Sequence, residues 1–495
     1  MTNKKNLDPR PSPPGAQRAS GPLSALALAL LLAGCAALAP DTRVSELPLA
    51  AAFKEAPAGW THAAPADGAE RGAWWSVFND PLLHSLAEQV EVSNQNVAAA
   101  TAAFAQAQAL VREQRATLFP TLGLNAGATR SGGGSGNSTS SSTNNSTGSS
   151  SGSGSRYQLG LAGSWELDLF GRLSAGVDAA GARAEASAAD LAAARLAAQG
   201  ELAVNYFSLR STDAESELLR ASIRAYEEST RITGNRYNAG IAPRSDLLQS
   251  QTQLANARAE LAGLQRTRAQ LEHAMAVLLG RAPADFALAP IAWQPPPIPA
   301  VPGVVPSELL QRRPDIAAAQ RRVAAANASI GAARAALFPS IGLSGNLGQS
   351  AASLGNLFSA SAFAWSLGVS LAQTVFDAGA RSARVDGARA AWDQSVAQYR
   401  QTVLTSFQQV EDQLAAARVL EQQELLRRQA SQAADQTEQQ VTNRYNAGLV
   451  GFTEVVQAQV TALNARRALA QAAAARQNAA VALIRALGGG WRAPA

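Results

Sequence analysis

Hydrophobic and polar residues recur with the period of an α-helix along most of this 495-residue chain. Ala, Gln, Leu and Arg dominate these stretches, a composition suited to long helices packed by small side chains. Gly176, Gly181 and Gly200 weaken the pattern locally, which leaves room for a break or an irregular turn. The periodicity predicts helices at about residues 81–118, 172–237, 246–279, 315–337, 380–445 and 454–487.

A period of two residues replaces the helical period in four short stretches. Apolar residues alternate there with small or polar ones, as in Trp365, Leu367 and Val369. Residues 131–155 are almost wholly Gly, Ser, Thr and Asn, which are too polar to pack, so we expect a flexible loop there. The pattern predicts two hairpins, each with one apolar and one polar face, with strands at about residues 120–130, 156–170, 340–348 and 362–376.

The hexapeptide Asn-Arg-Tyr-Asn-Ala-Gly occurs twice, at residues 235–240 and 443–448, each time at the end of a long helical stretch. Its glycine sits where a left-handed residue ends a helix. Ser245-Asp246 and Thr453-Glu454 follow as predicted N-caps with an acid in the first turn. Leu-Phe-Pro also occurs twice, at residues 118–120 and 337–339. These echoes indicate two copies of one unit.

The repeats and the composition divide the chain into six segments. We expect a signal peptide at 1–34, an extended leader at 35–80, a first repeat at 81–282, a proline-rich linker at 283–306, a second repeat at 307–490 and a tail at 491–495.

The N-terminal segment ends at the one cysteine of the sequence, Cys35. The apolar run at residues 23–33 is too short to span a membrane but suits a signal peptide. Residues 32–35, Leu-Ala-Gly-Cys, resemble the lipobox of bacterial lipoproteins, which predicts lipidation of Cys35. Ala36, rather than Asp, resembles the pattern that permits sorting to the outer membrane. The alternative is an ordinary signal peptide with an incidental cysteine.

Composition argues against an enzyme and against a nucleic-acid partner. The formal charge is +5, of which residues 1–34 contribute +3, so no basic patch is expected on the remainder. One cysteine and three scattered histidines supply neither a disulfide nor a metal cluster. The acidic pair Glu411-Asp412 lies inside a helix, where adjacent side chains point in different directions. We expect no catalytic activity and no cofactor.

Four strands with an apolar outer face point to an assembly. An open sheet edge in lipid leaves backbone groups unpaired, so membrane strands must close into a barrel. The smallest membrane barrels have about eight strands, so four cannot close one. Subunits that pool their strands can, and a trimer provides twelve. The alternative is a soluble sandwich whose apolar faces are covered inside the protein.

Several motifs in fixed order resemble the TolC-like outer-membrane efflux family, in particular its lipoprotein branch. They span nearly the whole mature chain, and each is weak alone. They are residues 74–81 around Trp74-Trp75, 118–120, 165–172 (Trp-Glu-Leu-Asp-Leu-Phe-Gly-Arg), 312–316 (Arg-Arg-Pro-Asp-Ile), 338–339, 410–412, 486–491 (Ala-Leu-Gly-Gly-Gly-Trp) and the two hexapeptides.

The resemblance implies a mixed architecture of long helices and membrane strands. It implies a homotrimer with a twelve-stranded β-barrel in the outer membrane, continued by a long periplasmic α-helical barrel. Such a duct is passive, binds no cofactor and is lipid-anchored in the cell outer membrane. It receives drugs or other toxic compounds from an inner-membrane pump of the RND type through a periplasmic adaptor. The alternative is a structural or adhesive surface lipoprotein, which would have no need of two hairpins with a continuous apolar face.

The resemblance also implies where the channel closes and where the adaptor binds. Tyr445, Thr453 and Gln457 match the family's periplasmic gate, and Arg444 and Glu454 lie beside them. In its close relatives the positions of Thr453 and Gln457 resemble Leu and Asp, so a ring of Gln457 would be neutral. We expect the second hairpin to move and the first, with its proline, to be the stiffer docking surface. The expected adaptor-contact residues are Asn238, Gly240, Pro243, Arg244, Asn446, Gly448 and Gly451.

Overall fold

A computed structural model describes residues 53–55, 72–131, 154–299 and 313–489. The expected signal peptide and Cys35 lie outside these ranges, as does most of the expected loop at 131–155. The described residues form two compact units. The sheet unit comprises residues 115–131, 154–176 and 328–387, and the helical unit comprises the rest.

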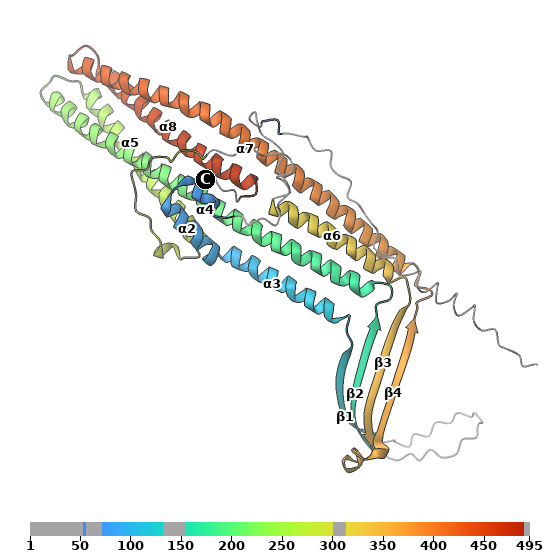
Figure 1. Cartoon of the computed structure of the whole chain (residues 1–495). Coiled ribbons are helices and arrows are strands. Elements are labelled where there is room, and N and C mark those ends of the chain that lie inside the picture. The colour runs from blue at the N-terminus through green and yellow to red at the C-terminus, as the bar shows by residue number, and fades with distance from the viewer. Residues whose placement is uncertain (1–52, 56–71, 132–153, 300–312, 490–495) are drawn as a thin grey trace, which may run out of the picture. The chain divides into compact units, whose positions relative to one another are not determined.

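The sheet unit contains four antiparallel strands in the order β1-β2-β3-β4 (Figure 1). The strands are β1 (Thr121–Ser131), β2 (Gly154–Leu167), β3 (Ser340–Ala351) and β4 (Phe363–Ala372). The register places Leu161 opposite both Leu124 and Leu347, and Leu347 opposite Trp365. Residues directly opposite one another share a face, so the apolar positions of all four strands form one continuous surface.

The other face of the sheet carries small and polar residues. Gly123, Ala162 and Asn346 follow one another across the first three strands, and Ser366 continues the row on β4.

On the apolar face, Trp365, Leu367 and Val369 are 71%, 70% and 74% exposed. A row of large apolar side chains with such high exposure indicates a surface that contacts a membrane or another protein.

Each strand-to-helix corner is closed by an aspartate. The carboxylate of Asp168 accepts hydrogen bonds from the backbone N–H groups of Leu173 and Ser174, at 2.9 and 2.7 Å. Asp377 accepts in the same way from Gly379 and Arg381. The predicted strands therefore end earlier than residues 170 and 376, at Leu167 and Ala372, because the chain turns there to begin the helices.

The two Leu-Phe-Pro segments form matching corners. Trp165 on β2 donates its indole N–H to the carbonyl oxygen of Leu118, at 2.9 Å. Gln373, just after β4, donates its amide to the carbonyl oxygen of Leu337, at 3.1 Å. In each half of the chain, a side chain on or just after the returning strand thus bonds to the carbonyl oxygen two residues before the proline.

The helical elements have matching lengths in the two halves. The helices α4 (Arg172–Asn238) and α7 (Ala380–Asn446) each have 67 residues. The helices α5 (Arg244–Leu278) and α8 (Phe452–Ala486) each have 35, and α3 (Gln95–Ala116) and α6 (Pro314–Ala335) each have 22. Helix α4 is continuous through Gly176, Gly181 and Gly200, so no break occurs there.

The predicted first helix is in fact two. Helix α2 (Pro81–Ser93) ends at Asn94, whose backbone is extended, and α3 begins at the next residue. The Asn94 side chain accepts hydrogen bonds from the N–H groups of Asn96 and Val97 and donates to the carbonyl oxygen of Leu278 on α5. A capping side chain that also bonds to a distant helix gives no signal in the local period, which is why the prediction was wrong.

The predicted N-caps of the return helices were also wrong. Helix α5 begins at Arg244 behind Pro243, and α8 begins at Phe452 behind Gly451. Neither preceding residue caps its helix with a side-chain hydrogen bond. Asp246 and Glu454 lie in the first turns, where a negative charge complements the helix dipole.

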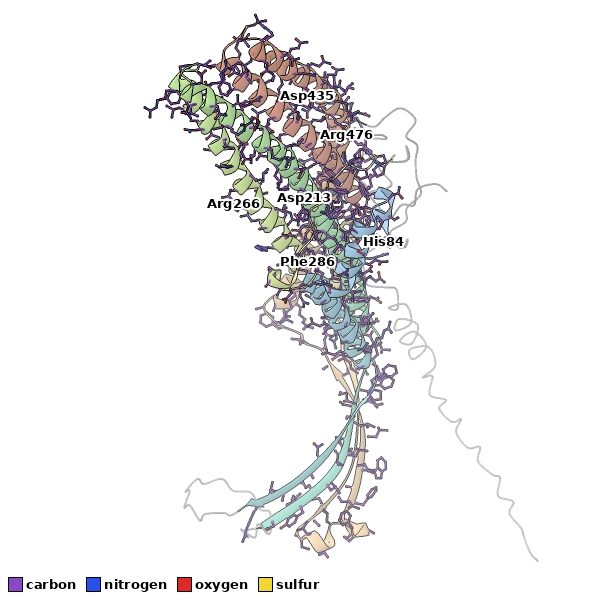
Figure 2. All side chains as sticks on the ribbon, turned by 90° about the vertical axis from the view of Figure 1, so that its left-hand side faces the viewer. His84, Asp213, Arg266, Phe286, Asp435 and Arg476 are labelled. Carbon is purple, nitrogen blue, oxygen red and sulfur yellow. The ribbon has the colours of Figure 1, made fainter. Side chains whose placement is uncertain are left out.

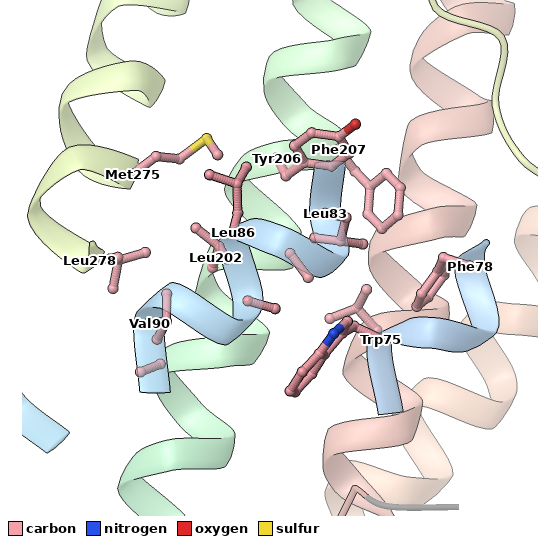
Figure 3. Packing of buried hydrophobic residues seen from close by; sticks show 14 of the residues in the cluster. Trp75, Phe78, Leu83, Leu86, Val90, Leu202, Tyr206, Phe207, Met275 and Leu278 are labelled. Atoms are coloured by element: carbon pink, nitrogen blue, oxygen red, sulfur yellow. The ribbon is translucent and has the colours of Figure 1, made fainter. Parts of the chain in front are cut away.

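The largest buried cluster lies in the helical unit, where a short 3₁₀ helix, η1 (Trp74–Phe78), and α2 pack against α4 and α5 (Figure 3). Phe78 packs on Phe207 with ring centroids 5.1 Å apart. Asp80 caps α2 and accepts a hydrogen bond of 2.6 Å from the hydroxyl of Tyr206 on α4. The Trp74-Trp75 motif thus contributes two buried side chains to this core, just before the start of α2.

The first part of the predicted linker is held against the helices. A second 3₁₀ helix, η2 (Pro283–Asp285), leads into an extended segment that packs on the main core through Phe286 and Trp293. Asp213 accepts hydrogen bonds from Arg210 and Arg268, which also donate to the linker carbonyl groups of Ala289 and Leu288. Figure 2 marks Asp213 and Phe286. These ion pairs and hydrogen bonds hold the described first part of the linker, up to residue 299, against the helices.

Glu411 anchors part of the leader to α7. Its carboxylate accepts hydrogen bonds from the backbone N–H groups of Lys54 and Glu55, at 2.6 and 2.9 Å. Phe53 is buried beside Phe407, with ring centroids 5.4 Å apart. The acidic pair noted in the sequence therefore has a structural partner. Within the described ranges, none of the helices combines the length and the apolar character of a transmembrane helix.

We predict that Tyr206→Phe lowers stability by about 1.5 kcal/mol near pH 7, because a buried hydrogen bond to a carboxylate is lost. Burial and the neighbouring Asp80 raise the pKa of Tyr206 to about 12, above its ordinary value of 10.0. The hydroxyl's contribution is therefore complete below pH 10 and is lost as the pH rises through 12. Thermal unfolding between pH 7 and 12 should show the difference between wild type and variant shrinking above pH 10. Tyr237→Phe is the exposed control, and an equal pH dependence in both variants would contradict the assignment.

Candidate functional site

Both hexapeptides end their helices with the same hydrogen-bonded turn. The N–H groups of Gly240 and Ile241 donate to the carbonyl oxygens of Tyr237 and Arg236, at 2.9 and 2.8 Å. In the second copy, Gly448 and Leu449 donate to Tyr445 and Arg444, both at 2.9 Å. The two glycines have φ of 68° and 74°, as the sequence predicted. This is the Schellman motif, in which a left-handed residue stops the helix.

The tips of the two helical hairpins lie at the same end of the helical unit (Figure 1). All seven expected adaptor-contact residues fall on these tips. Asn238 and Asn446 are the last residues of α4 and α7, and Arg244 is the first of α5. The full set is exposed to solvent: Asn238, Gly240, Pro243, Arg244, Asn446, Gly448 and Gly451.

Tyr445 lies between the two hairpins. Its ring packs on Phe452 at the start of α8, with centroids 5.7 Å apart. The guanidinium of Arg236, from the first hairpin, lies 5.1 Å from the centre of the Tyr445 ring. A guanidinium over an aromatic face is an attractive contact, worth about 0.5–1 kcal/mol at an exposed site. The tyrosine singled out by its motif is therefore one half of a contact between the tips.

A second contact joins the tips one turn further along. The hydroxyl of Thr453 on α8 donates a hydrogen bond of 3.2 Å to the side-chain oxygen of Gln249 on α5. The Gln457 side chain is exposed on the same helix, and its backbone carbonyl accepts from Thr461. Arg444 and Glu454 are exposed as well. In the described part of the chain, no hydrogen bond connects Tyr445 to Arg444 or to Gln457.

Two consecutive arginines on α8 hold the hairpins along their length. Arg466 faces its own hairpin and pairs with Asp435 and Glu438 on α7, at 2.8 and 2.7 Å. Arg467 faces the first hairpin and pairs with Glu215 on α4 and Glu260 on α5, at 3.4 and 2.7 Å. Figure 2 marks Asp435, and also Arg476, which repeats the pairing with α7 closer to the end of α8. The tip contacts thus sit at the end of a braced pair of hairpins.

Each tip contact joins one predicted gate residue on the second hairpin to a residue on the first hairpin that was not predicted. Arg236 and Gln249, both on the first hairpin, were not among the predicted gate residues. Arg236 occupies the same hexapeptide position as Arg444, so the repeat itself drew attention to it. Gln249 carries no comparable signal. Among the described residues, no group of three or more His, Cys, Asp or Glu side chains could hold a metal ion.

Comparison with known proteins identifies the class. The sequence model of the family described as "Outer membrane efflux protein" matches residues 86–281 and 305–489. The chain therefore belongs to the outer membrane efflux protein family, whose members are non-enzymatic transport ducts. This result confirms the family resemblance seen in the motifs.

Similar proteins carry consistent names. The chain is 34% identical over 472 residues to the probable efflux pump outer membrane protein TtgC of Pseudomonas putida, covering 95% of each chain. It is 34% identical to the outer membrane protein OprJ of Pseudomonas aeruginosa, covering 95% of this chain and 96% of that one. The solved structure of the outer-membrane channel OprN superposes with a TM-score of 0.82 at 32% identity, over 92% of this chain and 100% of that one.

We predict that Gly448→Ala destabilises the second tip by about 1 kcal/mol, because φ of 74° is strained for any residue with a Cβ. Gly451→Ala is the matched control, since Gly451 has φ of −78° and no atom near its would-be Cβ. Hydrogen exchange should show faster exchange of the backbone amides at positions 448 and 449 in the first variant and little change in the second. Equal protection in both variants would argue against the left-handed turn.

Proposed function

We propose that this protein is the passive outer-membrane channel of a tripartite efflux system. Three copies would form one duct, which carries drugs or other small toxic compounds from a periplasmic adaptor and an inner-membrane pump to the exterior. The observation that carries the proposal is the continuous apolar face of the four-stranded sheet together with its two unpaired edges. Membership of the outer membrane efflux family and the names of the relatives support it.

The sheet argues for a trimer. β1 and β4 are edge strands of the described chain, and β4 presents its apolar side chains to the outside. Pairing β1 of one copy with β4 of the next would satisfy both edges, and three copies would close twelve strands. The small and polar residues of the opposite face would then line a lumen. A lipid anchor at Cys35 would hold each copy in the same membrane.

The two halves of the chain support a duplicated origin for the duct. Their helices agree in length, their corners use the same hydrogen bonds, and the family model matches each half separately. Three copies would bring six hairpin tips to one aperture. The exposed tips are the surface that an adaptor would bind, and the pump, which we take to be of the RND type, would deliver substrate through it.

We further propose that Tyr445, Thr453 and Gln457, with Arg444 and Glu454 beside them, line this aperture. The contacts of Tyr445 with Arg236 and of Thr453 with Gln249 support a closed state in which the second tip is held against the first. Gln457 is neutral and exposed, so three copies would form no acidic ring there, and cations would gain no binding site at that level. Opening would require the adaptor to separate the tips.

Deleting the gene tests the function. We expect the deletion strain to become more sensitive to at least some antibiotics, dyes or organic solvents, and wild-type protein supplied in trans to restore resistance. Susceptibility is measured in a strain that lacks related ducts, because these could substitute. An unchanged susceptibility profile in that strain would contradict the export function.

Single-channel conductance tests the aperture. Tyr445→Ala combined with Gln457→Ala should raise conductance in planar bilayers severalfold. The double variant removes the aromatic contact and replaces two large side chains with small ones, which widens the proposed constriction. Tyr237→Ala is the matched control, since Tyr237 holds the same hexapeptide position in the first hairpin. Conductance that stays at the wild-type value in the double variant would exclude these residues from the gate, without bearing on export itself.

A further inference from the structure

A cavity of about 400 Å³ lies in the helical unit where α4, α7 and α8 meet the start of α6. Leu196 and neighbouring alanines of α4 form an apolar wall. Polar groups of Arg313, Gln409, Gln413 and Arg485 line the remainder, together with Asp315. The volume falls within the range of small-molecule sites. Its lining residues do not include those of the hairpin tips.

Asp315 is the one carboxylate among the described residues of the lining, and it is already paired with Arg313. Arg313 donates to both oxygens of Asp315, at 3.1 and 2.8 Å, and the N–H of Ile316 donates to one of them at 3.0 Å. Arg313 also donates to the carbonyl oxygen of Ala486 at 2.9 Å and to the side-chain oxygen of Gln409 at 2.8 Å. The amide of Gln409 is therefore left with its N–H₂ group to offer, and hydrogen-bond donors dominate the lining.

Arg485 is the donor without a partner. Within the described part of the chain, its guanidinium makes no hydrogen bond and no ion pair, although the side chain is half-buried. Burial and the positive charge of Arg313 lower the pKa of Arg485 below its ordinary value, and Glu201 opposes this shift. Glu201 offsets part of the cost of placing two guanidinium groups in one half-buried space, and an anion bound in the cavity would offset more of it.

Gly200 leaves room for Arg485 against α4. The arginine crosses α4 at this glycine, and a Cβ there would lie 2.0 Å from Cδ and 2.5 Å from Nε of Arg485. Gly200 costs helix stability in the middle of α4, where Ala would be favoured. The close approach of Arg485 explains why a glycine occurs at this position of α4. The Arg485 side chain thus lies directly against this helix.

We propose that this cavity binds a small oxyanion, a phosphate or an organic carboxylate, with Arg485 as the principal ligand. Arg485 presents a fork of N–H groups that suits two oxygens of such an anion. The amides of Gln409 and Gln413 and the remaining N–H of Arg313 add further donors, and Leu196 contacts any apolar part. Glu201 competes with the anion for Arg485. Among the described residues of the lining, no carboxylate is free to bind a metal cation or an amine, so the lining favours an anion.

Isothermal titration of the full-length protein in detergent tests the site, with inorganic phosphate and citrate as separate probes at constant ionic strength. Wild type is expected to bind at least one of the two, and the tighter probe distinguishes phosphate from carboxylate chemistry. Arg485→Gln should weaken binding about tenfold or more, as expected for loss of a charge-assisted contact. Glu201→Gln should strengthen it, since the competing carboxylate is gone.

Two variants keep the result interpretable. Arg428→Gln removes an exposed arginine that pairs with Glu424 outside this cavity and should leave binding unchanged. Gly200→Ala should weaken binding by displacing Arg485 while keeping its charge. Circular dichroism and size-exclusion chromatography confirm that each variant folds and assembles as wild type does. Binding of neither probe to wild type, or equal binding by wild type and Arg485→Gln, would overturn the proposal.

Discussion

Backbone hydrogen bonding at the edges of the four-stranded sheet is the constraint on which the rest of the structure depends. Along β1 and β4, every second residue directs its N–H and C=O groups away from the sheet, and lipid would provide no partners for them. In lipid, a sheet with one apolar face and two open edges would therefore be incomplete as a single chain. Several larger features fit the proposed assembly: the matching halves, the long helices with small side chains, and the exposed aromatic side chains of β4.

The helical unit meets a different demand, because its helices have few large apolar residues with which to hold one another. Specific polar contacts take over part of that role. Arg466 and Arg467 brace α8 against three other helices, and the Asp213 network holds the linker. Tyr445 and Thr453 then join the tips through weak and exposed contacts. Several ion pairs along the shaft and only weak, exposed contacts at the tips are what the proposed gate requires, since the tips would have to part while the shaft stays intact.

Local signals in the sequence were sufficient for most elements and for the turns. The period of two and the period of 3.6 residues located the strands and helices, and the glycines of the hexapeptides marked the left-handed turns because only that residue tolerates them without strain. What the sequence could not supply were contacts between distant residues. The break at Asn94 depends on Leu278, and Arg236 meets Tyr445 across more than two hundred residues. The return helices began early because Pro243 and Gly451 set the backbone without any side-chain cap.

The matching helix lengths restrict how this chain can change. Inserting one residue into α8 between Arg467 and Thr453 would turn the tip by about 100° and advance it by about 1.5 Å. Thr453 would then face away from Gln249, while Arg467 kept its partners. A compensating insertion in α7 would have to restore Tyr445 at the same time. Length variation in this region is therefore confined to paired insertions of near-whole helical turns.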